Sequence, residues 1–183
     1  MRPIILTSTG DYFDLTDPHN SEINIETIAH ALSNICRFSG HCSEFYSVAQ
    51  HSVLVSKMVP QEHALMGLLH DASEAFLGDV ISPLKSMLPE YKTLEARVTN
   101  AIYKRFNIGP HQYPTIKKAD LMALATERKY LLPATDYEWE CLHGINAINV
   151  MNVPEFRCWG PTEAKDNFYS RYYNIVRSGV MQV

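Results

Sequence analysis

The sequence predicts a mainly α-helical fold in a single domain, with a short β-hairpin at its N-terminus. Most of the 183-residue chain repeats its apolar residues every three or four positions, which is the period of a helix that buries one face. A strand pattern occurs in the first 15 residues. A chain of this length can bury roughly 70% of its unfolded surface. It therefore needs neither a disulfide nor a structural metal to fold, and a bound metal would be catalytic.

The predicted hairpin pairs residues 4–7 with residues 12–15 across a turn at 9–11. Both runs contain residues that favour strands, and Gly10 supplies the turn between them. The next segment, 17–20, reads Asp-Pro-His-Asn and breaks the pattern. The hairpin should therefore end before the helical part of the chain begins.

Helical periodicity begins at Ile25 and continues through most of the chain. The predicted helices cover 25–36, 47–59, 62–76, a short segment from 82, 91–106, 114–132 and 161–177. Residues 136–149 are also compatible with a helix, and residues 152–160 with a loop. No internal repeat or linker divides the sequence, so we expect residues 1–183 to form one domain.

Composition excludes several kinds of partner. The formal net charge is −4, from 16 basic and 20 acidic residues, and there is no basic run, so we expect no stable nucleic-acid partner. No apolar run approaches the ~20 residues that span a bilayer, which predicts no membrane partner. The N-terminus lacks the apolar segment of a signal peptide. The four cysteines match no zinc-site spacing, so we expect reduced thiols in a cytoplasmic protein.

Three segments place side chains that bind metals on inward-facing helical positions. His51 lies on the apolar face of its helix, the adjacent pair His70-Asp71 ends an apolar run, and Asp120 lies on the inner stripe of a later helix. A buried carboxylate is costly unless it is paired. Two imidazoles and two carboxylates suit one divalent ion, such as Mn²⁺, Co²⁺, Fe²⁺, Zn²⁺ or Mg²⁺. Such an ion lowers the pKa of bound water and polarises a phosphoryl oxygen, so we predict a hydrolase.

The same residue order resembles the HD-domain superfamily of metal-dependent phosphohydrolases, in which a His…His-Asp…Asp set binds the metal. Further motifs extend the likeness: Arg37-Phe38, Ser-Val-Ala-Gln-His at 47–51, His-Asp-Ala-Ser-Glu at 70–74, Gly78-Asp79 and Pro-Leu-Lys at 83–85. They are similar to the branch that contains YfbR-like 5′-deoxynucleotidases and phage dATP triphosphohydrolases. The resemblance covers about residues 25–130. It implies an HD-domain helical bundle and a homo-oligomer.

The resemblance also implies roles for five further residues. Glu74 and Asp79 would be catalytic, handling the protons of the attacking water and of the leaving oxygen. Arg37 and Lys85 would bind phosphate oxygens, Arg37 with a bidentate fork and Lys85 as a point charge. Phe38 would stack on the base or form its wall.

The expected activity is removal of phosphate from a 2′-deoxyribonucleotide, with a 5′-monophosphate as the favoured substrate. An alternative is a dNTP triphosphohydrolase of the dATP type, which would use the same metal ligands but more positive charge around the phosphates. An alternative of another class is a non-catalytic HD domain that binds a nucleotide as a regulatory module. We interpret Glu127 and Arg128 as an internal ion pair rather than as catalytic residues.

Overall fold

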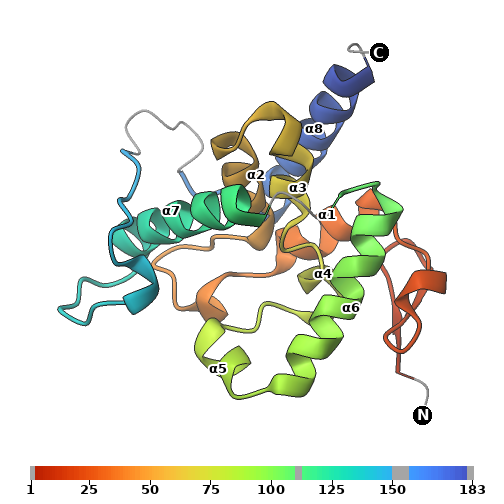
Figure 1. The fold of residues 1–183 in the computed structure, drawn as a ribbon, viewed down its shortest axis with the longest axis horizontal. Helices are drawn as coiled ribbons and strands as arrows, with labels where there is room; N and C mark the ends of the chain where they lie inside the picture. The colour runs from red at the N-terminus through yellow and green to blue at the C-terminus, as the bar shows by residue number, and fades with distance from the viewer. Residues whose placement is uncertain (1–2, 110–112, 150–156, 181–183) are drawn as a thin grey trace.

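The computed structural model describes residues 3–109, 113–149 and 157–180, and it is mainly helical. Strands β1 (Ile4–Leu6) and β2 (Tyr12–Asp14) form an antiparallel hairpin in which Ile5 lies opposite Phe13. The helices are α1 (Ile25–Asn34), α2 (Val48–Met58), α3 (Ala64–Leu69), α4 (Glu74–Leu77), α5 (Ser82–Ser86), α6 (Pro89–Arg105), α7 (Tyr113–Leu131) and α8 (Pro161–Val180) (Figure 1). The predicted fold class, mainly α with an N-terminal hairpin, is confirmed. One hydrophobic core extends from Phe13 to Ile175 in a single domain.

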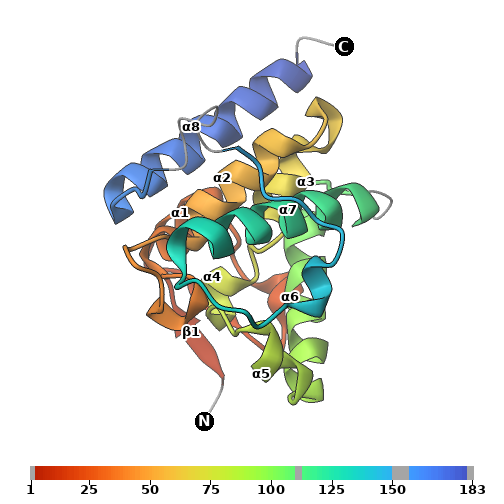
Figure 2. The ribbon, with the colours of Figure 1, turned by 90° about the vertical axis from the view of Figure 1, so that its left-hand side faces the viewer.

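Helix α2 lies at the centre of this core. Every residue from 48 to 56 is buried, as expected of a helix that is covered on several sides. It packs against α1, α3, α7 and α8, and Figure 2 shows α8 lying across α1 and α2. The Ser47 side chain accepts a hydrogen bond of 3.1 Å from the Gln50 amide and so caps the helix. A fixed start and a packed surface make α2 a rigid support for His51.

Helices α2 and α3 cross at very short distance because Gly67 has no side chain. A Cβ atom at Gly67 would lie 3.0 Å from the Ser56 Cα atom and 3.2 Å from Val59 Cγ2. The Gly67 carbonyl also accepts a hydrogen bond of 2.9 Å from His70 Nδ1. This crossing therefore determines how closely the end of α3 approaches His51.

The prediction of one continuous helix over 62–76 is wrong. Helix α3 ends at Leu69 and α4 begins at Glu74. Between them the Ala72 amide donates to the Leu69 carbonyl at 3.1 Å, and the Glu74 amide donates to the Asp71 carbonyl at 3.0 Å. These bonds span three residues instead of four, so the backbone winds more tightly here than in an α-helix. The tight turn lies at the predicted metal-binding pair.

The C-terminal third also differs from expectation. Residues 136–149 contain the 3₁₀ turn Glu140–Leu142 and no α-helix. Tertiary contacts hold this segment, because Arg128 donates to the Tyr137 carbonyl and its guanidinium lies 5.2 Å from the Trp139 ring centroid. The loop expected at 152–160 falls outside the described residues up to 156. Helix α8 continues to Val180, beyond the expected end at 177.

Two smaller predictions concern cysteines and membranes. Cys36, Cys42, Cys141 and Cys158 are all free thiols, as the sequence indicated. None of the helices in the described ranges combines the length and the apolar character that crossing a bilayer requires.

Candidate functional site

The predicted metal-binding side chains converge from three separate segments. His51 Nε2, on α2, lies 3.2 Å from His70 Nε2 and 3.4 Å from Oδ1 of Asp120 on α7. These three residues form a group that could hold a metal ion. Asp71 Oδ2 lies 3.2 Å from His70 Nε2 and 3.5 Å from His51 Nε2. Three of the four predicted ligands therefore form the candidate metal group, and Asp71 lies beside its two histidines.

Both imidazoles are oriented by hydrogen bonds on the side away from this group. His51 Nδ1 lies 2.6 Å from Glu127 Oε1, and His70 Nδ1 lies 2.9 Å from the Gly67 carbonyl oxygen. A partner on Nδ1 leaves Nε2 facing the cluster, which is the arrangement that supports a histidine ligand to a metal. The donor set of two nitrogens and two carboxylates fits a divalent cation.

The electrostatics of the cluster favour positive charge at its centre. Burial by itself would raise the pKa of Asp71 and of Asp120, but the neighbouring imidazoles outweigh it and hold both pKa values well below their usual range. Burial and Arg37 lower the pKa of His51, but Glu127 and Asp120 outweigh them and raise it to about 9. Protonated imidazole thus balances the carboxylates, a role that a cation would take over when bound.

Glu127 is completely buried and joins the cluster to Arg37. Its Oε2 atom lies 3.2 Å from Arg37 Nε and 3.1 Å from Nη2, while its Oε1 atom contacts His51. Burial by itself would raise the pKa of Glu127, but the charges of Arg37 and His51 lower it. Glu127 does form an internal ion pair, but the expected partner, Arg128, is wrong. Glu127 points inward and pairs with Arg37, 90 positions earlier in the chain.

Only one nitrogen of the Arg37 guanidinium faces the predicted metal ligands. Its Nε and Nη2 atoms face Glu127, and its Nη1 atom lies 3.6 Å from Asp71 Oδ2. The expected bidentate fork toward phosphate is thus already directed at Glu127. Nη1 is the nitrogen that faces the predicted metal ligands.

Phe38 lies in a strained loop. Its φ of 54° and the φ of 52° at Ser39 fall in the left-handed region, and Gly40 continues it at 82°. Non-glycine residues hold this conformation at a cost of about 1–3 kcal/mol each, and such strain concentrates at functional sites. The Phe38 ring lies 6.4 Å from the Trp139 ring and is not among the described residues that line the cavity beside the cluster. The base wall expected at Phe38 stays a prediction.

The two predicted catalytic carboxyls lie near the cluster. Glu74 is 4% exposed, and its Oε1 atom lies 3.5 Å from Lys85 Nζ. Burial and Asp71 raise the pKa of Glu74 well above its ordinary value, and burial is also the main cause of the raised pKa of Asp79. Gly78, at φ 79°, makes the turn that leads to Asp79. Neither carboxyl is among the described residues that line the cavity beside the cluster. Raised carboxyl pKa values next to a cluster of charged groups are a feature of acid–base groups.

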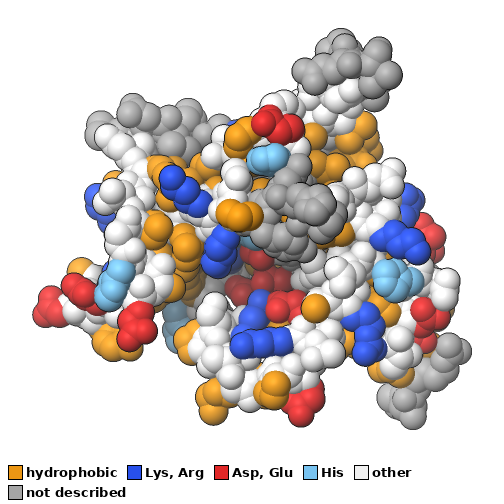
Figure 3. Space-filling model, in the orientation of Figure 1, with side chains coloured by type: hydrophobic (Ala, Val, Ile, Leu, Met, Phe, Trp, Pro, Cys, Tyr) orange, Lys and Arg blue, Asp and Glu red, His pale blue; other side chains and the backbone are white. Residues whose placement is uncertain are grey.

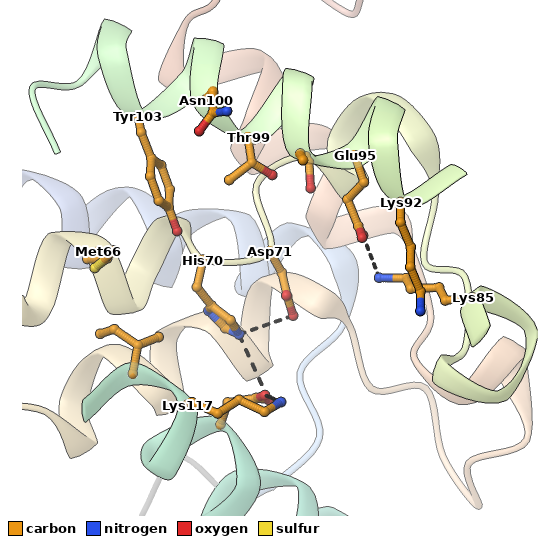
Figure 4. A pocket seen from close by; sticks show the side chains of 14 residues that line it. Met66, His70, Asp71, Lys85, Lys92, Glu95, Thr99, Asn100, Tyr103 and Lys117 are labelled. Carbon is orange, nitrogen blue, oxygen red and sulfur yellow. Dashed lines mark hydrogen bonds and ion pairs between the residues drawn. The ribbon is translucent and has the colours of Figure 1, made fainter. Parts of the chain in front are cut away.

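A cavity of about 400 Å³ opens beside the cluster, between α6 and the start of α7. His70, Asp71 and Asp120 line it, and Figure 4 shows His70 and Asp71 from close by. Figure 3 shows acidic side chains in a hollow with basic ones around it. Lys85 lines the cavity, and its Nζ atom lies 2.6 Å from Glu95 Oε1. Its expected contact with phosphate stays a prediction.

Sequence reasoning missed all of the described residues that α6 contributes to the cavity wall. These residues are Lys92, Glu95, Ala96, Thr99, Asn100 and Tyr103. Their spacing of three and four places them on one face of the helix, a signal that was present in the sequence. Lys117 was also missed; its Nζ atom lies 2.9 Å from Asp120 Oδ2, one helical turn away on the same face of α7.

Comparison with known proteins finds two related chains of similar length. The chain is 45% identical over 171 residues to the Escherichia coli protein described as "Uncharacterized protein YfdR", a match that covers 93% of this chain and 94% of that one. It is 31% identical over 185 residues to "Uncharacterized protein RCAP_rcc00048" of Rhodobacter capsulatus, with the same coverage. No family model matches the sequence.

Proposed function

The chain belongs to the same protein family as YfdR of Escherichia coli, and we propose that it is a metal-dependent phosphohydrolase of the HD-domain type, acting on 2′-deoxyribonucleotides. The observation that carries this proposal is the convergence of His51, His70 and Asp120, with Asp71 beside the two histidines, at a lysine-lined cavity. His70, Asp71 and Asp120 line this cavity, and His51 lies buried behind them. Two imidazoles and two carboxylates would hold one divalent ion. Such an ion supplies Lewis acidity toward water and a phosphate oxygen.

The charge of the cavity supports a 5′-monophosphate as substrate. Its lining contains three lysines, at 85, 92 and 117, and three carboxylates, at 71, 95 and 120. The lining is therefore neutral overall, and a divalent ion would leave a net charge of +2. A phosphate monoester carries a charge of about −2 at neutral pH, which this site balances. A triphosphate brings further negative charge that the described lining does not offset, so dNTP hydrolysis is the weaker alternative.

The side chains around the cluster have separate tasks in this proposal. Glu74 and Asp79, with their raised pKa values, hold and release protons at the water and at the leaving oxygen. Lys85 neutralises phosphate charge, and Glu95 holds it in place. Arg37 contributes a single nitrogen, Nη1, because Glu127 occupies the rest of its fork.

A product-based screen tests the proposal. Purified protein is incubated with dNMPs, NMPs and dNTPs in the presence of Mg²⁺, Mn²⁺ or Co²⁺, and the products are separated by chromatography. Release of inorganic phosphate from dNMPs is the expected result. Triphosphate release from dNTPs would favour the alternative, and tight nucleotide binding without any turnover would favour a regulatory HD domain.

Replacing Glu74 with glutamine is expected to lower turnover by roughly 10²–10⁴-fold while metal binding is retained. The same change should stabilise the metal-free protein at neutral pH. A carboxyl whose pKa rises on folding contributes stability that is complete below its unfolded pKa and is lost as the pH rises through the folded pKa. The pKa of Glu74 is raised above 4.5, so wild-type stability should decline above that pH and the variant should decline less.

Turnover at neutral pH measures the expected loss of activity. Thermal unfolding between pH 4 and pH 8 measures the expected change in the pH dependence of stability. Glu26→Gln, at an exposed position on α1, is the control and should change neither quantity. Wild-type turnover in Glu74→Gln would remove this residue from the mechanism.

A further inference from the structure

The cavity has two chemically different ends on either side of the predicted metal ligands. Figure 4 shows Lys85, Lys92 and Glu95 together at one end, and His70 and Asp71 between the two ends. The other end has the uncharged residues Met66, Thr99, Asn100 and Tyr103. Lys117 lies below His70 in Figure 4, and its charge is paired with Asp120 at 2.9 Å. A phosphate attached to the cluster therefore has a charged region on one side and a neutral region on the other.

Helix α6 runs along both ends and sets the distance between them. From Glu95 to Tyr103 the helix advances by about 12 Å, at 1.5 Å per residue. Thr99 lies midway between them on the same face. A molecule of nucleotide size, with its phosphate beside His70 and Asp71, can therefore extend along α6 into the neutral end.

The neutral end combines apolar surface with the hydrogen-bonding side chains of Thr99 and Asn100. Met66, Ile116 and the Tyr103 ring are almost completely buried and give it firm apolar walls. Within the described part of the chain, no hydrogen bond uses the side chain of Thr99 or Asn100. Such a site suits a flat, neutral group with donors and acceptors at its edge. A second phosphate or a charged peptide would find no counter-charge there.

We propose that this neutral end binds the nucleoside part of the substrate and that Asn100 determines which base is preferred; this inference rests on the proposed function. An asparagine amide offers one donor and one acceptor side by side, and it can therefore form a bidentate pair with the edge of a base. Thr99 donates or accepts one further bond next to it, toward the base or the deoxyribose. Neither residue touches the reacting phosphate, so both act on specificity and not on the chemical step.

The test compares the four dNMPs with 2-deoxyribose 5-phosphate, which has the same phosphate and sugar but no base. Asn100→Ala is expected to lower kcat/KM for the preferred dNMP by about 10-fold, mainly through KM, because one bidentate pair is lost. Hydrolysis of 2-deoxyribose 5-phosphate should not change. Thr93→Ala, on α6 but outside the cavity lining, is the matched control and should leave all five substrates unaffected.

Two results would overturn the inference while leaving the proposed function intact. One is an equal change for all five substrates, and the other is no change for any of them. If the wild-type protein hydrolyses none of the dNMPs, the proposed function fails, and calorimetry with the four deoxynucleosides then decides the inference. Binding that weakens in Asn100→Ala supports it; absent binding, or binding that is equal in the two proteins, overturns it.

Discussion

Replacing His70 with alanine is expected to abolish both metal binding and phosphate release while the helical fold persists. His70 Nε2 lies 3.2 Å from the predicted ligand atoms of both His51 and Asp71, so its loss removes a nitrogen from the centre of the cluster. The side chain is 10% exposed at the edge of a cavity, and its removal leaves the core helices in contact. Titration with Mn²⁺ by calorimetry, turnover assays and circular dichroism measure the three effects separately.

His30→Ala is the matched control for this prediction. His30 is an exposed histidine on α1 and is not among the described residues that line the cavity, so its replacement should change neither metal affinity nor turnover. A His70→Ala protein that binds Mn²⁺ with wild-type affinity would show that the cluster is not a metal site. The proposed function would then lose its main support.

Replacing Glu127 with glutamine is expected to weaken metal binding by roughly 10–100-fold and to destabilise the protein by about 3–5 kcal/mol. Glu127 Oε1 faces His51 and Oε2 faces Arg37, so the single amide oxygen of glutamine can occupy only one of these two positions, and the amide nitrogen then faces the other donor. The lost charge also leaves Arg37, 9% exposed, without its main counter-ion. Calorimetric titration with Mn²⁺ and chemical denaturation measure the two losses.

A double variant separates metal binding from stability. Combining Glu127→Gln with Arg37→Met removes both buried charges, so most of the stability should return, as happens when a buried ion pair is replaced as a unit. Metal affinity should stay low, because the carboxylate behind His51 is still absent. Recovery of metal affinity along with stability would show that Glu127 acts only on folding and does not position His51.

Glu163→Gln is the control for both Glu127 variants. Glu163 forms an ion pair with Arg157, and both side chains are at least 38% exposed. A surface pair of this kind contributes about 0–1 kcal/mol, and its loss should not change metal affinity.

The candidate cluster could be predicted from sequence because each ligand obeys a local rule. The helical period places His51 and Asp120 on inward faces, and the apolar run before His70 brings the His-Asp pair to the core. The period also places Glu127 inside, two turns after Asp120. The partners of Glu127, Arg37 and His51, could not be predicted in this way. Helical periodicity indicates which way a side chain faces, but not which distant residue it contacts.

The wall formed by α6 shows the same limit. Thr99 and Asn100 look like ordinary polar positions on a half-exposed helix, since nothing in their local sequence names the surface opposite them. The tight turn at residues 70–73 was missed for a related reason. An i→i−3 and an i→i−4 hydrogen-bond pattern share nearly the same apolar spacing, and packing decides between them.

By itself the sequence determined that this protein is mainly helical, that it begins with a hairpin, and that two histidines and two aspartates face inward. These properties follow from residue spacing, which acts over a few positions along the chain. Only the tertiary structure decided that Glu127 binds Arg37 and His51 together, and that α6 completes a cavity with one charged and one neutral end. Such contacts join residues far apart in the chain, and the packing of whole helices determines which of them meet.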